Sequence, residues 1–222
     1  SKAQEWAKAL EYFLKVAPKT AQAFATHEAI TLYDHAEAAV DQLGEDALIH
    51  TLMAICQAKS DIYFVLSDFE RSRAEGERLL TLARRAGDRQ REGMALAGMG
   101  WASSRAHDLD QALSHARQAI AVAEEVDAPL IQASGHFIMS QVYAVTGRLD
   151  DAWGEVHQAL TNNRSGDAID RRLSIWIPGT IKNWQGEYAE ASRLLSEAMR
   201  LAREQNLLFP LLYICFTYGV TL

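Results

Sequence analysis

Apolar and small residues recur along the chain with a period of about 40 residues. Each unit opens after a turn on one residue, mostly apolar, which we call the anchor. The anchors Phe69, Leu109, Leu149 and Tyr188 are 40, 40 and 39 residues apart, and Thr26 lies in the same slot 43 residues before Phe69. The positions three and ten residues after the anchors hold Ala29, Ser72, Ala112, Ala152 and Ala191, then Ala36, Leu79, Ala119, Ala159 and Ala198. Residues seven apart share one helix face, so the pattern predicts close helix packing at these positions.

A second helix is expected before each anchor. It carries a small residue nine positions before the anchor, namely Ser60, Gly100, Ser140 and Gly179, and the period continues to Gly219. The expected helices cover residues 4–16, 18–24, 27–42, 46–66, 69–86, 89–105, 109–126, 129–145, 149–161, 168–184, 188–205 and 208–222. The pattern therefore predicts one domain over 1–222, with about five repeats and an unfinished helix at 208–222.

Composition supports a helical interpretation. The 222 residues include 36 Ala and 25 Leu but only 13 Gly and 4 Pro. Alanine and leucine are strong helix formers, whereas strands favour β-branched and aromatic residues. An all-α fold is expected, and sheets and barrels are disfavoured.

The repeat resembles the tetratricopeptide repeat family over essentially the whole chain. The best-preserved unit has Gly100, Leu109, Ala112 and Ala119 at the family's small and apolar positions. The resemblance implies a right-handed superhelical solenoid of antiparallel helix pairs. The spacing near 40 residues, rather than 34, implies longer helices, as in long-repeat variants of bacterial regulators. The chain departs from the family pattern at Gly76, where a bulky aromatic is common, and at Lys59 and Pro178, where leucine is common. We expect these repeats to be locally loosened or kinked.

A narrower resemblance concerns the opening segments 6–15, 17–19 and 27–30 and the segment 82–88. They are similar to the repeat region of bacterial signalling ATPases, many of which also carry a nucleotide cyclase or a DNA-binding domain, as transcriptional regulators do. The apolar helix 208–222 would have no partner helix after it, so we expect the chain to be a piece of a longer protein.

Charge and cysteine content restrict the partners and the compartment. The net charge of −7 argues against a nucleic-acid partner. The seven arginines between Arg71 and Arg91 alternate with carboxylates, which indicates a solvated mixed face. The charge-free run 207–222 is too short to span a bilayer, so no membrane partner is expected. Two cysteines and no secretory signal favour a cytoplasmic protein.

No motif for catalysis, a metal or a cofactor stands out. The chain lacks a GxxxxGK[ST] phosphate loop and an HExxH zinc motif, and its seven histidines have no tight ligand spacing. We therefore expect neither enzymatic activity nor a bound cofactor or metal.

The remaining candidate site is the concave face that the first helix of each pair would line. This stripe of aromatic and amide side chains fits either a binding groove or packing between repeats, and we expect Trp101 and Trp184 to be exposed. The candidate groove residues are Gln57, Asp61, Phe64, Trp101, Arg105, Phe137, Gln141, Trp176, Asn183, Trp184 and Tyr213.

Three functions fit these features. The first is a non-catalytic scaffold that binds a protein or peptide within a larger bacterial regulatory protein. The second is a sensor module that binds a small ligand or signalling peptide and controls an attached catalytic or DNA-binding domain. The third is a homo-oligomerisation module that self-associates through helix 208–222.

Overall fold

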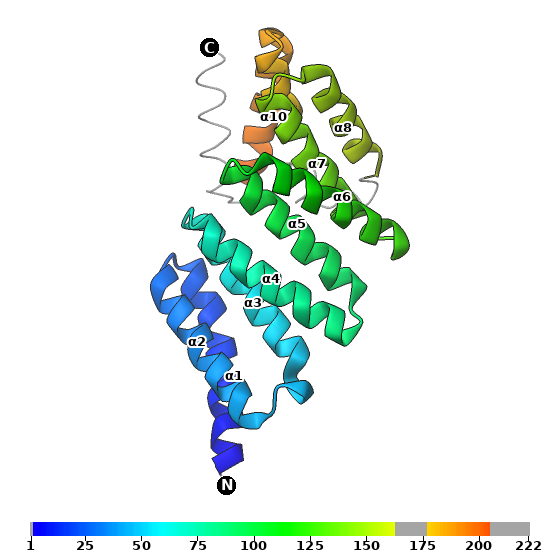
Figure 1. Ribbon diagram of the computed structural model, residues 1–222. Coiled ribbons are helices and arrows are strands. Elements are labelled where there is room, and N and C mark those ends of the chain that lie inside the picture. The colour runs from blue at the N-terminus through cyan, green and yellow to red at the C-terminus, as the bar shows by residue number, and fades with distance from the viewer. Residues whose placement is uncertain (1, 163–176, 205–222) are drawn as a thin grey trace. The chain divides into compact units, whose positions relative to one another are not determined.

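The computed structural model describes residues 2–162 and 177–204, and these residues form helices joined by short connections, with no strand among them (Figure 1). The elements are α1 (Lys2–Gln22), α2 (Thr26–Leu43), the 3-10 helix η1 (Asp46–Leu48), α3 (Ile49–Val65), α4 (Phe69–Ala86), α5 (Arg89–Arg105), α6 (Leu109–Glu125), α7 (Pro129–Val145), α8 (Leu149–Asn162), a helix at 177–184 and α10 (Tyr188–Glu204). The expected helix 208–222, with Gly219, lies outside the described residues.

The helices belong to two compact units, Ser1–Asp108 and Leu109–Leu222. In the first unit, α1 packs on α2, α3 packs on α4, and α4 packs on α5. In the second unit, α6 packs on α7 and α7 packs on α8. Short turns join these neighbours, so consecutive helices are antiparallel. The all-α architecture of helix pairs is confirmed, while a continuous superhelix through both units stays a prediction.

The small residues of the repeat lie where helices meet. All ten residues at the positions three and ten after the anchors are at most 2% exposed. Ser60, nine residues before an anchor, is buried and donates a hydrogen bond from Oγ to the backbone oxygen of Ser72 at 3.0 Å. This bond joins α3 to α4 at the predicted contact. The packing role of the small positions is therefore confirmed.

The turn before each anchor has the same geometry in all five repeats. The residue two positions before the anchor has a left-handed φ, and these residues are Phe24 (61°), Ser67 (60°), His107 (63°), Gly147 (79°) and Gly186 (79°). In each turn the next residue donates its N–H to the carbonyl five residues earlier, as Asp68 does to Tyr63 at 2.9 Å. This is the Schellman pattern of helix ends. Glycine occupies only two of these five left-handed positions. The repeated turn therefore cannot be recognised from the positions of glycines alone.

Two glycines with opposite environments test this backbone description. Gly87 ends α4 with φ +68°, whereas Gly98 lies inside α5 with open space around the position of a Cβ atom. We expect Gly87→Ala to lower the free energy of unfolding by about 1 kcal/mol, because an L-residue is strained in the left-handed region. Gly98→Ala should raise it by about 0.5–1 kcal/mol. Urea unfolding measures both variants, and changes of the same sign would contradict the description.

The expectation of separate helices at 4–16 and 18–24 is wrong, because α1 runs unbroken with Pro18 inside it. Proline removes a backbone N–H and commonly kinks a helix. Here Ala17 before the proline and Ala21 after it both pack in the core of the first unit. Burial of one continuous apolar face against α2 outweighs the local cost.

The 43-residue spacing between Thr26 and Phe69 also has a structural cause. The three-residue helix η1 is inserted between α2 and α3, and it accounts for the difference from the usual spacing of 40. The first two repeats therefore keep the common helix pairing despite the longer connection.

Candidate functional site

The structure places the predicted groove residues on both units, so they do not form one demonstrated site. Gln57, Asp61 and Phe64 lie on α3, and Trp101 and Arg105 lie on α5, all in the first unit. The others that the structure describes belong to the second unit, and they are Phe137 and Gln141 on α7 and Asn183 and Trp184 on helix 177–184. Trp176 and Tyr213 lie outside the described residues.

Gln57 and Asp61 form the best-defined polar feature among these residues. They lie one helical turn apart on α3, and Gln57 Nε2 donates a hydrogen bond to Asp61 Oδ1 at 2.8 Å. Asp61 is exposed, yet desolvation by the surrounding protein raises the pKa of its carboxyl group, while the bond from Gln57 acts in the opposite direction.

Tyr33 belongs to the surroundings of this pair. It comes from α2 and is buried, and its pKa is raised by burial and, to a smaller degree, by the charge of Asp61. A helix behind α3 therefore contributes a side chain close to the Gln57–Asp61 pair. The pair lies over the core of the first unit and is not on an isolated helix face.

The charge of Asp61 should lower stability at neutral pH. The pKa of Asp61 is raised in the folded state, so the folded protein binds a proton at this group more tightly than the unfolded chain does. The stability gained from the protonated carboxyl group is complete below the unfolded-state pKa and is lost as the pH rises through the folded-state pKa. We expect Asp61→Asn to raise the free energy of unfolding at pH 7, and the gain should narrow as the pH falls toward 4.5. Urea unfolding at several pH values measures this difference.

Asp41→Asn is the matched control for this change, because Asp41 is exposed on α2 and forms no ion pair with any residue that the structure describes. It removes the same formal charge at a site away from the Gln57–Asp61 pair. Equal effects of the two substitutions at pH 7 would show that Asp61 is an ordinary surface carboxylate.

The aromatic side chains of the stripe have different environments. Phe64 is partly buried and packs edge-on against the anchor Phe69, with ring centroids 5.6 Å apart. Trp101 is partly buried. Trp184 is 48% exposed, as expected. Phe137 is 1% exposed, so the expectation that it lines a groove is wrong, and its ring belongs to the core.

In the second unit, polar groups gather near the end of helix 177–184. Asn183 is buried, and its Oδ1 atom has no hydrogen-bond partner. The neighbouring Lys182 lies over the ring of Trp153 at 4.2 Å and forms an ion pair with Glu187 at 2.9 Å. These contacts tie α8 to helix 177–184 and stabilise the second unit.

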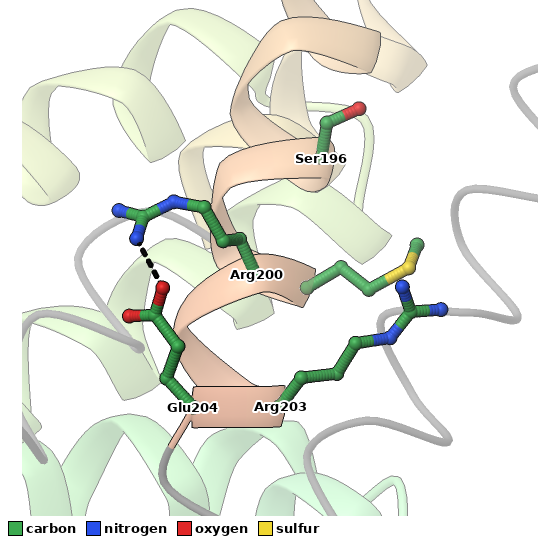
Figure 2. Close-up of a pocket in the computed structure, with 5 residues that line it drawn as sticks. Ser196, Arg200, Arg203 and Glu204 are labelled. Atoms are coloured by element: carbon green, nitrogen blue, oxygen red, sulfur yellow. Dashed lines mark hydrogen bonds and ion pairs between the residues drawn. The ribbon is translucent and has the colours of Figure 1, made fainter.

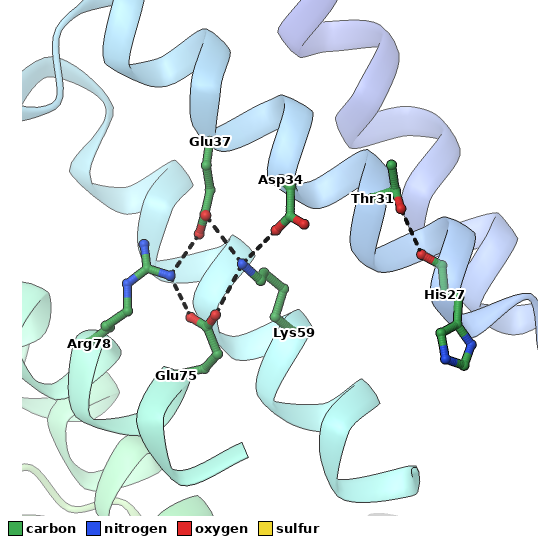
Figure 3. A network of polar contacts seen from close by, with 7 residues as sticks. All are labelled: His27, Thr31, Asp34, Glu37, Lys59, Glu75 and Arg78. Atoms are coloured by element: carbon green, nitrogen blue, oxygen red, sulfur yellow. Dashed lines mark hydrogen bonds and ion pairs between the residues drawn. The ribbon is translucent and has the colours of Figure 1, made fainter. Parts of the chain in front are cut away.

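Lys59 is at the centre of a charged network that joins α2, α3 and α4 (Figure 3). Its Nζ atom lies 2.8 Å from Asp34, 3.2 Å from Glu37 and 3.0 Å from Glu75. Arg78 adds contacts to Glu37 at 3.1 Å and to Glu75 at 2.8 Å. Burial alone would lower the pKa of Lys59, but the hydrogen bonds to Asp34 and Glu75 outweigh it and raise this pKa.

The expectation that Lys59 and Gly76 loosen their repeat is wrong, because neighbouring helices accommodate both residues. Lys59 replaces an apolar contact with paired charges between three helices. Gly76 leaves room for Met99 of α5, whose Cγ atom lies 2.6 Å from the position that a Cβ atom would take. Both departures from the family pattern are compensated by neighbouring helices.

The same network includes three potential metal ligands, Glu37, Cys56 and Glu75, whose ligand atoms lie within 4.8 Å of one another. The two carboxylates are already paired with Lys59 and Arg78. Burial raises the pKa of Cys56 to about 12, so the thiol stays protonated at neutral pH and is a poor ligand. The arrangement fits an internal ion-pair network better than a metal site.

The arginine-rich stretch is a mixed charged face, as the sequence indicated. Each of the seven arginines between Arg71 and Arg91 has a carboxylate within ion-pair distance, as in Arg84–Glu92 at 2.9 Å and Arg85–Glu45 at 2.7 Å. These cations are therefore already neutralised by acidic neighbours.

A surface hollow lies along α10 (Figure 2). It is lined by Ser196, Met199, Arg200, Arg203 and Glu204, and Arg200 bonds to Glu204 at 2.6 Å. All these lining residues come from one helix, so among the residues that the structure describes no groups from different elements converge on a ligand there. None of the described helices has both the length and the apolar character that a membrane span requires.

Solved structures resemble this chain in fold. Aspartyl phosphate phosphatase F from Bacillus subtilis matches 97% of the chain with 16% identity and a TM-score of 0.71. A Rap protein complexed with Competence and Sporulation Factor matches 93% with 13% identity and a TM-score of 0.76. BtubC from P. vanneervenii matches 92% of this chain and 91% of its own length, with 14% identity and a TM-score of 0.65.

The chain spans 60% of the phosphatase and 57% of the Rap protein. No family model and no curated protein matches its sequence. At these low identities the likeness concerns the fold, and it agrees with the tetratricopeptide-like architecture of helix pairs.

Proposed function

We propose that this chain is a non-catalytic repeat module that binds a peptide, or an extended segment of a protein, along α3 and α5 of the first unit. The observation that carries the proposal is the Gln57–Asp61 pair, in which an exposed carboxylate on α3 accepts a hydrogen bond from the amide one turn earlier. Aromatic side chains at Phe64 and Trp101 add large contact area on the same helices.

The structural neighbours support a binding role without defining the partner. One of them, a Rap protein of similar fold, is complexed with Competence and Sporulation Factor. Another is named a phosphatase, and because this chain spans 60% of it, that name describes the whole neighbour and is not carried over to this chain. We place the module within a larger bacterial regulatory protein, where it would be combined with a catalytic or DNA-binding domain. The cytoplasmic location stays a prediction from cysteine usage.

Selection from a random heptapeptide library tests the proposal. We expect enriched peptides that bind the 222-residue chain and compete with one another for one site. Failure to enrich any peptide, or peptides whose binding survives every substitution on α3 and α5, would contradict it. Light scattering on the same preparation distinguishes the alternative of a self-association module, which requires a concentration-dependent mass.

A further inference from the structure

Charges of opposite sign meet where α2 contacts α3 and α4 (Figure 3). In these contacts α2 supplies the carboxylates Asp34 and Glu37, and the other two helices supply the cations Lys59 and Arg78. Glu37 is shared, with its carboxylate oxygens 3.2 Å from Lys59 Nζ and 3.1 Å from a guanidinium nitrogen of Arg78. Three of the five side chains that α2 buries are alanines, so its apolar contribution is small. The ion pairs therefore carry a large share of the attachment of α2 to the second repeat.

The connection between α2 and α3 has the features of a hinge. It consists of Gly44, Glu45 and the short helix η1, and none of these residues is buried. Gly44 has a φ of +106° and open space around the position of a Cβ atom. The ion pairs from Arg85 to Glu45 and Asp46 lie on the surface and contribute little to stability. A segment with so little burial is among the first to open in a folded protein.

We propose that α1 and α2 form a hairpin that detaches from α3 as one unit, with residues 44–48 as its hinge and the Glu37–Lys59 contact as its latch. Helices α1 and α2 pack along each other, so they stay paired when the hairpin moves. Detachment separates Glu37 from Lys59 and Arg78 and uncovers the adjacent face of α3. Cys56 lies on this face, because it is 0% exposed and its sulfur is within 4.8 Å of a Glu37 carboxylate oxygen. This opening does not depend on the proposed peptide binding.

The rate at which Cys56 reacts with a maleimide tests the proposal. A buried thiol reacts only when the structure opens, so this rate follows the population of the open state. Cys215→Ser in every variant leaves Cys56 as the single thiol. We expect Glu37→Gln to speed the reaction by about 10-fold or more, because the charge that two cations share is lost. Asp34→Asn removes the more exposed carboxylate of the network and should act in the same direction, so the test does not depend on one variant.

Glu92→Gln distinguishes detachment of the hairpin from unfolding of the whole first unit. Glu92 is buried on α5 and pairs with Arg84 of α4 at 2.9 Å and with Arg89, and these contacts stay intact when the hairpin detaches. The substitution should lower the urea midpoint of unfolding, yet it should change the Cys56 rate by less than about 2-fold. Asp41→Asn, the matched charge control on α2, should change neither quantity. Circular dichroism checks that all variants are folded.

Hydrogen exchange under native conditions locates the opening in the chain. Isolated helices are marginally stable, so the amides of a detached hairpin exchange with solvent. Exchange in α1 and α2 should respond to Glu37→Gln and not to Glu92→Gln, in parallel with the Cys56 rate. If Glu92→Gln speeds the Cys56 reaction as much as Glu37→Gln does, the first unit opens as a whole and the proposal is overturned. An unchanged Cys56 rate in Glu37→Gln and Asp34→Asn also overturns it.

Discussion

Substitution of Lys59 by alanine should lower the free energy of unfolding by about 3–5 kcal/mol, the largest effect expected of a single change in the first unit. The Lys59 side chain is 6% exposed and neutralises Glu37 and Glu75, whose side chains are 17% and 10% exposed. Its removal leaves two partly desolvated carboxylates with Arg78 as their shared cation. Urea unfolding monitored by circular dichroism measures the change.

Two further variants make this prediction specific. Arg85→Ala removes ion pairs to Glu45 and Asp46 on the solvent-exposed side of α4, and it should cost less than about 1 kcal/mol. In the double variant Lys59→Leu with Glu75→Leu the destabilisation should be smaller than the sum of the single effects, because one charge of each sign is removed. If Lys59→Ala costs no more than Arg85→Ala, the network is not a structural connection between the first two repeats.

Substitution of Trp101 by alanine should weaken binding of a selected peptide by about 2 kcal/mol, or roughly 30-fold, with little change in stability. Trp101 lies on α5 in the first unit and is partly buried. A side chain of this size loses contact area with the ligand when it is truncated. Isothermal titration calorimetry and urea unfolding on the same preparation measure the two quantities.

Trp6→Ala is the matched control, because Trp6 is exposed on α1 and was not predicted to lie in the groove. It should change neither affinity nor stability appreciably. If Trp101→Ala unfolds the first unit while the folded fraction keeps its affinity, Trp101 is a packing residue and the groove does not extend onto α5.

The repeat could be predicted because close packing imposes a local and periodic requirement on side-chain size. Ala29, Ala112 and Ala152 are each buried where two helices of a repeat pack closely. The regular spacing of these small residues made this packing visible in the sequence. The course of α1 through Pro18 could not be predicted in this way. It depends on how well the helix packs against α2, which is a tertiary property.

The site was predicted less completely than the fold. Gln57 and Asp61 were identified by their helical register, but Phe137 in an equivalent register is buried by its tertiary surroundings. The Lys59 network was missed as a structural feature, although Lys59 itself was noted as a charged residue at an apolar position. Asp34 and Glu37 lie three residues apart on the preceding helix, and this spacing could have identified them as partners of Lys59.

The most direct test of the peptide-binding account is a map of backbone amide chemical shifts in the 222-residue chain with and without a selected heptapeptide. The account predicts that the largest changes lie on α3 around Gln57, Asp61 and Phe64 and on α5 around Trp101, together with a change in the side-chain amide signal of Gln57. Changes confined to α2 and α4, or an unaffected Gln57 amide in a saturated complex, would contradict it.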